Sequence, residues 1–134
     1  NVAMDHIAIM NKRFGDLITK ILSGEKKIES RWSKNKIAPW DKVHAGDTVY
    51  FKGSGGPVTA KALVSKVMQF EKKGFEKARK LFPIPDEWTR GKNYGVLIWL
   101  KNPEKVSPFK INKSGFGSAA AWLCIKEVKR IRVD

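Results

Sequence analysis

Three charged side chains stand close together in a short run that has the pattern of a β-strand. Lys26, Glu29 and Arg31 lie in the segment SGEKKIESRW, residues 23–32. Side chains alternate between the two faces of a strand, so Glu29 and Arg31 share one face. A buried pair of this kind needs further partners for each charge, and it could then hold the arginine rigidly at the mouth of a cavity. An exposed ion pair, worth about 0–1 kcal/mol, is the alternative interpretation.

These residue types suit two kinds of chemistry. Lys26 and Arg31 can contact a phosphate or a base edge, while Glu29 can orient Arg31 or accept a hydrogen bond from a base amino group. Metal-independent hydrolysis is the second kind, with Lys26 and Glu29 as the candidate catalytic groups. The sequence contains no Cys-x-x-Cys and no His-x-x-x-His pair, so we predict neither a metal site nor a cofactor.

A glycine-rich turn supplies further candidate contacts. Residues 53–57 read Gly-Ser-Gly-Gly-Pro and lack the Gly-Lys-Ser/Thr ending of a phosphate-binding loop, so they indicate a hairpin turn. Its exposed N–H groups could still contact a phosphate, which makes Lys52, Ser54 and Gly55 candidate nucleic-acid contacts.

Five tryptophans could form the core or stack on bases. Trp99 and Trp122 lie in apolar runs, which predicts that they are buried. Trp40 and Trp88 lie among polar or turn residues, which favours positions at which their rings close the ends of a barrel. Trp32 fits that role and base stacking equally well, since aromatic side chains beside lysines are how proteins stack unpaired bases.

The hydrophobic pattern predicts the elements that would position these residues. Apolar residues at i, i+3, i+4, i+7 and i+8 indicate a helix over 14–22, which Gly24 would end. A second helix is expected over 71–82. Strands are expected over 6–10, 27–32, 48–51, 58–70, 94–100 and 122–133. We predict one α+β domain over 1–134, built as a small barrel or a strongly curled sheet.

Composition narrows the class of protein. Lys and Arg total 27 against 13 Asp and Glu, and the net charge of +14 attracts polyanions such as RNA. No apolar run approaches the roughly 20 residues of a membrane span, so we predict no membrane association. The lone Cys124 suits a reducing compartment, and we expect the protein in the cytoplasm. Met4 fits a native first residue, with residues 1–3 as an added remnant.

The charged segment resembles a known family signature. Gly24-x-Lys26-x-x-Glu29-x-Arg31 is similar to the G-x-K-x-x-E-x-R motif of ASCH domains, relatives of the PUA RNA-binding fold, and it follows a helix as it does in that family. The run 45–51 (AGDTVYF) resembles the family's Gly-Asp turn and the strand after it, and 113–117 (KSGFG) is similar to bacterial members. The resemblance covers most of the chain.

The resemblance implies a PUA-like mixed β-barrel of about five to seven strands with flanking helices. It also implies a cleft lined by Lys26, Glu29 and Arg31. Members of the family are proposed to bind RNA, or to act on nucleic acid or modified nucleosides. An RNA-binding module is therefore the favoured function, with Trp32 or Phe116 stacking a base. The other candidate contacts are Lys113 and Ser114, together with a basic C-terminal surface of Lys126, Lys129, Arg130 and Arg132.

Two other functions stay open. One branch of the family resembles N4-acetylcytidine amidohydrolases, in which a lysine, a threonine and a glutamate cooperate. Lys26 matches the lysine, but Glu29 stands where the threonine would be, and Glu71 and Glu76 are only candidates for the glutamate. A ribonuclease-like hydrolase with Glu29 as general base belongs to the same alternative. A protein-interaction or transcription-regulatory domain, with its basic face on an acidic partner, is the third interpretation.

Overall fold

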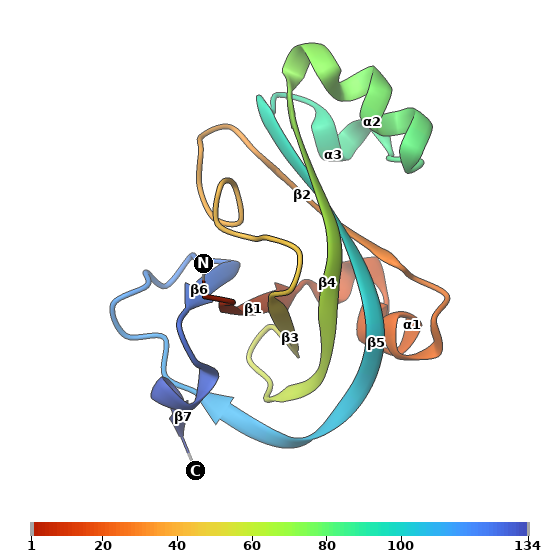
Figure 1. Cartoon of the computed structure of the whole chain (residues 1–134). Helices are drawn as coiled ribbons and strands as arrows, with labels where there is room; N and C mark the ends of the chain where they lie inside the picture. The colour runs from red at the N-terminus through yellow and green to blue at the C-terminus, as the bar shows by residue number, and fades with distance from the viewer. Residues whose placement is uncertain (1, 134) are drawn as a thin grey trace.

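The structure, a computed structural model, describes residues 2–133 of the chain. Asn1, part of the predicted remnant 1–3, lies outside the described residues. Within them, a curled sheet is flanked by short helices (Figure 1). The strands are β1 (Asp5–Met10), β2 (Ile28–Ser33), β3 (Thr48–Gly53), β4 (Val58–Glu71), β5 (Tyr94–Ile111), β6 (Trp122–Ile125) and β7 (Arg132–Val133). The helices are η1 (Lys12–Phe14), α1 (Leu17–Ser23), η2 (Lys72–Gly74), α2 (Phe75–Leu81), α3 (Asp86–Thr89) and η3 (Val128–Arg130).

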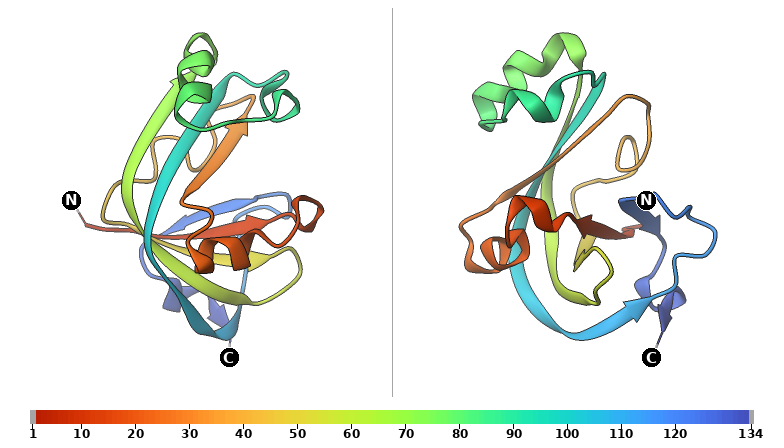
Figure 2. Two further views of the ribbon diagram at one scale, coloured as in Figure 1. Left: turned by 90° about the vertical axis from the view of Figure 1, so that its right-hand side faces the viewer. Right: turned by 180° about the vertical axis from the view of Figure 1, so that it is seen from behind.

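The sheet curls into a half-barrel because two long strands bend together. The strand order is β2-β5-β4-β3-β1-β6, and β7 pairs with β5. β1 and β3 are parallel, while the other pairs are antiparallel. β4 and β5 run side by side from the α2 end of the molecule to the opposite end (Figure 2). Three shifts of register interrupt this pair, and such bulges increase local bend and twist.

Three hydrophobic clusters pack against the curled sheet. Val49 and Phe51 of β3 belong to the largest cluster, on which α1 lays its apolar stripe. Ile7 of β1 belongs to a second cluster, which is covered by the later half of β5 and the residues that follow it. Phe70, Phe75 and Leu97 belong to a third, which fastens α2 to the sheet. The α2 end of the half-barrel is therefore stabilised by the third cluster, and the opposite end by the second.

A buried polar network ties the first strand to the predicted Gly-Asp turn. Asp47 is 3% exposed, and its carboxylate accepts hydrogen bonds from the N–H groups of Met4 and His44 at 2.9 Å each. His6 Nε2 lies 2.8 Å from Asp47 Oδ2, and the indole N–H of Trp122 donates to His6 Nδ1 at 3.0 Å. Burial lowers the pKa of His6, so the neutral ring donates to Asp47 and accepts from Trp122. This network fixes Trp122 beneath the candidate site.

The structure differs from the sequence prediction in the later half of β5. The strand expected over 94–100 continues to Ile111, through residues 101–111 with their two prolines and many charges. Their charged side chains face solvent, while Phe109 packs into the second cluster. The prolines are tolerated because the pairing with β4 is irregular there.

Three further predictions are wrong in part. The last predicted strand, 122–133, is broken by η3 into β6 and β7. The first helix begins at Leu17, and Phe14 lies before it in η1 with 40% of its surface exposed. Trp99, predicted in the core, is half-buried with the Lys66 ammonium 4.9 Å from its ring centre.

Candidate functional site

The candidate site begins at the end of α1. Gly24 ends that helix in the left-handed conformation, with φ of 83°, as predicted for a helix-terminating glycine. The chain then enters β2, which is the outermost strand of the sheet beside β5. At the other end of the strand order, β6 is likewise outermost. Because the sheet is curled, these two ends approach each other, and the site lies where they meet.

Arg31 bridges the two ends of the curled sheet. From β2, its Nη1 donates to the carbonyl of Ala121 and its Nη2 to the carbonyl of Ile9, both at 3.2 Å. The guanidinium also lies 5.2 Å from the ring centre of Trp122. These contacts fix the plane of the guanidinium and leave 20% of the side chain exposed.

Glu29 lies between the two cations of the motif. Its side chain is 7% exposed, with Oε1 at 3.9 Å from Lys26 Nζ and Oε2 at 3.8 Å from Arg31 Nη2. These separations are too long for hydrogen bonds. Oε1 accepts from the N–H of Ser30 at 3.0 Å, whereas Oε2 is a buried acceptor that receives no hydrogen bond from residues 2–133. Buried carboxylate oxygens are normally satisfied, so Oε2 is available to a donor from a ligand.

Lys26 completes the group from the turn before β2. Its Nζ donates to the carbonyl of Ile28 at 2.7 Å and lies 5.5 Å from the ring centre of Phe82. Only 12% of the side chain is exposed. The three motif side chains therefore converge at one place, with one cation on each side of a desolvated carboxylate.

The three side chains line one cavity of about 400 Å³, within the roughly 300–1,000 Å³ range of small-molecule sites. Four cationic and two anionic side chains contribute to its walls, which leaves the cavity positive. Phe14 and Trp88 both line it, and their rings pack edge to face with centres 5.5 Å apart. The cavity therefore offers charged, polar and aromatic surfaces together.

Trp32 is a fixed wall of the cavity. Its indole N–H donates to Ser30 Oγ at 3.1 Å, and its ring meets the Phe75 ring edge-on at 4.9 Å. The ring also covers Gly95, where an added Cβ would lie 2.1 Å from Trp32 Cζ3. A side chain at residue 95 would displace the ring, so the glycine is what lets Trp32 lie flat on β5.

A second cavity of about 560 Å³ continues the first. The two share Arg31, Trp32 and Ala121, and the second adds Phe116 from the loop before β6. Phe116 and Trp32 are the predicted stacking residues, and both therefore lie along this continuous groove.

The remaining predicted contacts lie outside both cavities. Ser54 and Gly55 are exposed in the turn between β3 and β4, where the N–H of Ser54 already donates to the carbonyl of Met10 at 3.2 Å. Ser114 is exposed in the loop after β5. Lys52 and Lys113 lie near each other close to that turn, since Lys113 lowers the pKa of Lys52. The structure thus separates the predicted residues into a cavity group and a group outside both cavities.

Several cavity residues were missed by sequence reasoning. Arg13 from η1 and Lys92 from the segment before β5 line the first cavity, together with Glu87 of α3. Their only sequence signal was charge, which is common throughout this chain. Glu71 and Glu76, the candidate hydrolase glutamates, are both exposed, and neither lines this cavity.

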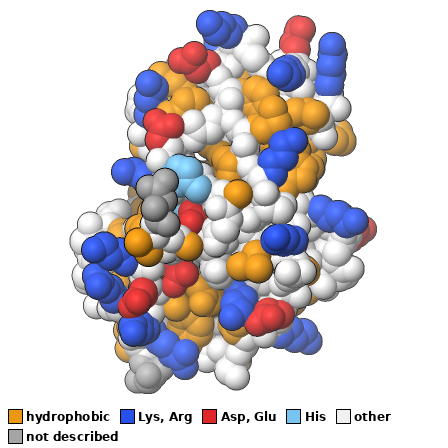
Figure 3. Space-filling view, in the orientation of Figure 1, with side chains coloured by type: hydrophobic (Ala, Val, Ile, Leu, Met, Phe, Trp, Pro, Cys, Tyr) orange, Lys and Arg blue, Asp and Glu red, His pale blue; other side chains and the backbone are white. Residues whose placement is uncertain are grey.

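Charge alone would not have located the site. Lysines and arginines are spread over the whole of the face in Figure 3, with acidic side chains between them. Within residues 2–133, no group of three or more His, Cys, Asp and Glu side chains is placed to hold a metal ion. No helix in that range is both long and apolar enough to cross a bilayer.

Comparison with solved structures identifies the class of fold. The crystal structure of an ASCH protein from Zymomonas mobilis has a TM-score of 0.61 with this chain at 12% identity, covering 92% of this chain and 88% of that one. A point mutant of the ASCH protein from the same organism gives 0.64 at 12% identity, covering 94% and 93%. A scan of family models finds no match, and neither does a sequence search of curated proteins.

The chain therefore has an ASCH-type fold, a PUA-like α+β half-barrel, over more than 90% of its length. The fold predicted from the sequence is confirmed. An identity of 12% establishes the fold alone, so the function has to be argued from the site.

Proposed function

We propose that this protein is a nucleic-acid-binding module that holds one unpaired base of a single-stranded RNA in the first cavity. The observation that carries the proposal is Glu29 Oε2, a buried acceptor without a donor that lies 3.8 Å from a fixed guanidinium. Such an oxygen favours a ligand that donates a hydrogen bond, and the exocyclic amino group of a base is a donor of this kind.

Each neighbouring group has a separate role in this proposal. Arg31 presents its guanidinium to an acceptor atom on the base or to a phosphate. Lys26 adds a second positive charge on the other side of Glu29. Trp32 supplies an aromatic wall for one base, and Phe116 supplies a surface for a neighbouring base along the groove.

RNA is favoured over an acidic protein partner because the site combines an unsatisfied acceptor with aromatic walls. An acidic partner would match the cations, but it would leave Glu29 Oε2 facing further negative charge. The net charge of +14 would add salt-sensitive affinity along the strand. We place this activity in the cytoplasm, where the lone Cys124 would stay reduced.

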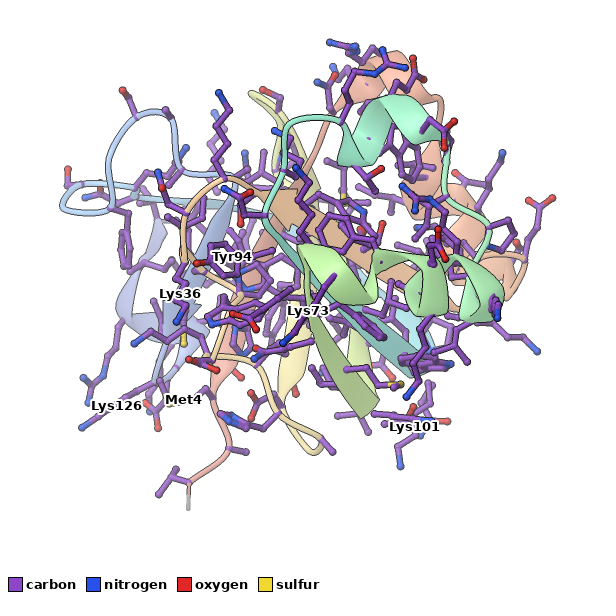
Figure 4. The ribbon with its side chains drawn as sticks, turned by 90° about the horizontal axis from the view of Figure 1, so that it is seen from above. Met4, Lys36, Lys73, Tyr94, Lys101 and Lys126 are labelled. Carbon is purple, nitrogen blue, oxygen red and sulfur yellow. The ribbon has the colours of Figure 1, made fainter. Side chains whose placement is uncertain are left out.

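The test is fluorescence anisotropy of a labelled short single-stranded RNA at low and near-physiological salt. We compare wild type with the double variant Lys26→Ala, Arg31→Ala. The matched control is Lys73→Ala, Lys101→Ala, which removes the same charge from two exposed positions (Figure 4). Both variants weaken the generic attraction equally, so only the loss beyond the control reports the cavity.

A loss of at least tenfold beyond the control supports the proposal, because a hydrogen bond to a charged group contributes about 1.5–3 kcal/mol. The proposal would be overturned if the two double variants bind RNA equally and salt dissociates both complexes. In that event the affinity is generic, and a screen of modified nucleosides for hydrolysis tests the enzyme alternative.

A further inference from the structure

Lys12 and Lys52 meet at Gly53, at the end of β3 and outside both cavities, and Lys113 lies within electrostatic reach of Lys52. The Lys12 side chain lies over this glycine, with Cε at 3.6 Å from the position that a Cβ would take. Lys52 Nζ donates to the Gly53 carbonyl at 3.1 Å. Lys113 stands near enough to lower the pKa of Lys52 by repulsion. We call Lys12, Lys52 and Lys113 the lysine cluster.

Lys52 is the unusual member, because it is buried without a counter-charge. It is 7% exposed, whereas lysines are almost never buried unless paired. Burial is the larger cause that lowers its pKa, and repulsion from Lys113 is the second. Within the described residues no carboxylate contributes to this shift, and the printed partner of its ammonium is a neutral carbonyl. An anion at this position would supply the missing counter-charge.

The lysine cluster adjoins the cavity wall. Lys52 pairs with Ile9 in the parallel ladder of β3 and β1, and the Ile9 carbonyl is one of the two that hold Arg31. Lys113 Nζ donates to the carbonyl of Ala120 at 3.0 Å, one residue before Ala121, whose carbonyl is the other. The cluster is therefore joined to the two carbonyls that hold Arg31, through β1 and through the segment before β6.

We propose that the lysine cluster is a phosphate subsite that binds a backbone phosphodiester of the same RNA strand whose base occupies the first cavity. This inference rests on the proposed function and adds the direction in which the strand leaves the cavity. A strand with one base beside Arg31 carries its next phosphates past β1 toward Gly53. Lys52 supplies a desolvated positive charge that contacts the phosphate, while Lys12 and Lys113 add positive electrostatic potential around it.

The experiment measures RNA affinity against salt concentration for wild type, Lys52→Met and Lys73→Met. Methionine keeps much of the apolar stem of Lys52 and removes its charge. Lys73 is the matched control, since it lies beyond the far end of β4 from the turn at Gly53 (Figures 1 and 4). We expect Lys52→Met to bind about tenfold more weakly, with a salt slope smaller by about 0.7, as for one lost phosphate contact on a single strand.

A second measurement uses RNAs in which one phosphodiester at a time is replaced by a neutral methylphosphonate. Replacing one particular linkage beside the held base should weaken binding by wild type. The same replacement should have no further effect on binding by Lys52→Met, as expected for a coupled pair in a double-mutant cycle. If Lys52→Met fails to fold, the exposed Lys12→Met variant takes its place in the cycle.

The two proposals fail in different ways. If the variant Lys26→Ala, Arg31→Ala loses affinity but Lys52→Met matches Lys73→Met and no single linkage stands out, only the phosphate subsite is overturned. If the cavity variant matches its own control, the proposed function fails and the subsite fails with it.

Discussion

Replacing Glu29 with glutamine tests how the cavity distinguishes bases. The N–H of Ser30 donates to Oε1, so the glutamine oxygen should keep that position and its NH₂ group should replace Oε2. The buried acceptor Oε2 is thereby replaced by a donor. A base amino group would lose its partner, whereas a base carbonyl would gain one.

Two effects of this substitution have opposite signs. A hydrogen bond to a carboxylate contributes about 1.5–3 kcal/mol, so its loss should weaken binding of amino-bearing bases about 10- to 100-fold. Loss of the negative charge raises the net charge of +14 by one unit, which strengthens generic attraction. The phosphates of the strand lie in solvent, where salt screens this gain to below about 1 kcal/mol. The hydrogen-bond effect is the larger, so we expect weaker binding.

The assay is anisotropy with short oligocytidylate, oligoadenylate and oligouridylate. Glu29→Gln should bind the first two more weakly and lose least with oligouridylate, whose base lacks an amino group. Glu104→Gln is the matched control, because Glu104 is 61% exposed in a surface ion pair with Lys61. Breaking a buried ion pair costs about 3–5 kcal/mol of stability, so urea unfolding must first confirm that Glu29→Gln is folded. Equal or tighter binding of oligocytidylate by folded Glu29→Gln, as in the control, would refute the reasoning.

Three further predictions concern the structure that supports the site. Gly95→Ala should lower the free energy of unfolding by about 1–3 kcal/mol, because the new Cβ displaces the Trp32 ring; an unchanged urea midpoint would contradict this. Trp122→Phe should cost about 1–3 kcal/mol by leaving His6 Nδ1 without a donor, and it should also weaken RNA binding by removing the indole beneath Arg31; wild-type stability would count against the network. Burial lowers the pKa of His6 below 6.5, so the unfolded chain takes up a proton that the folded chain excludes; stability should fall as the pH drops below 6.5, less steeply in His6→Gln, and equal slopes in urea titrations would oppose it.

Local patterns in the sequence were sufficient to predict the elements around the motif. Gly24 ends α1 in the left-handed conformation because this conformation is cheap for glycine and costly for other residues. Glu29 and Arg31 share a face because alternation is a property of any strand. Both inferences depend only on a residue and its neighbours along the chain. The order of expected strands and helices, with the family resemblance, predicted an α+β barrel or curled sheet, and the solved ASCH structures confirm this class of fold.

Long-range pairing was beyond the reach of those patterns. The strand expected over 94–100 extends to Ile111, because β4 pairs with the residues after Leu100 and the shifts of register accommodate their two prolines. Trp99 lies in an apolar run, yet its position in the curled sheet leaves it half-buried. In each case a tertiary contact outweighed the local preference.

The sequence by itself determined the three charged side chains of the motif, and the tertiary structure decided what each of them contacts and which other residues join them. Arg31 is held by carbonyls 22 and 90 residues away, which reach it only because the sheet curls until β2 approaches β1 and β6. The same closure buries Glu29 and leaves Oε2 without a donor. Residue spacing fixes direction over a few positions, whereas burial and unmet hydrogen bonds depend on segments that are far apart in the chain and meet only in the fold.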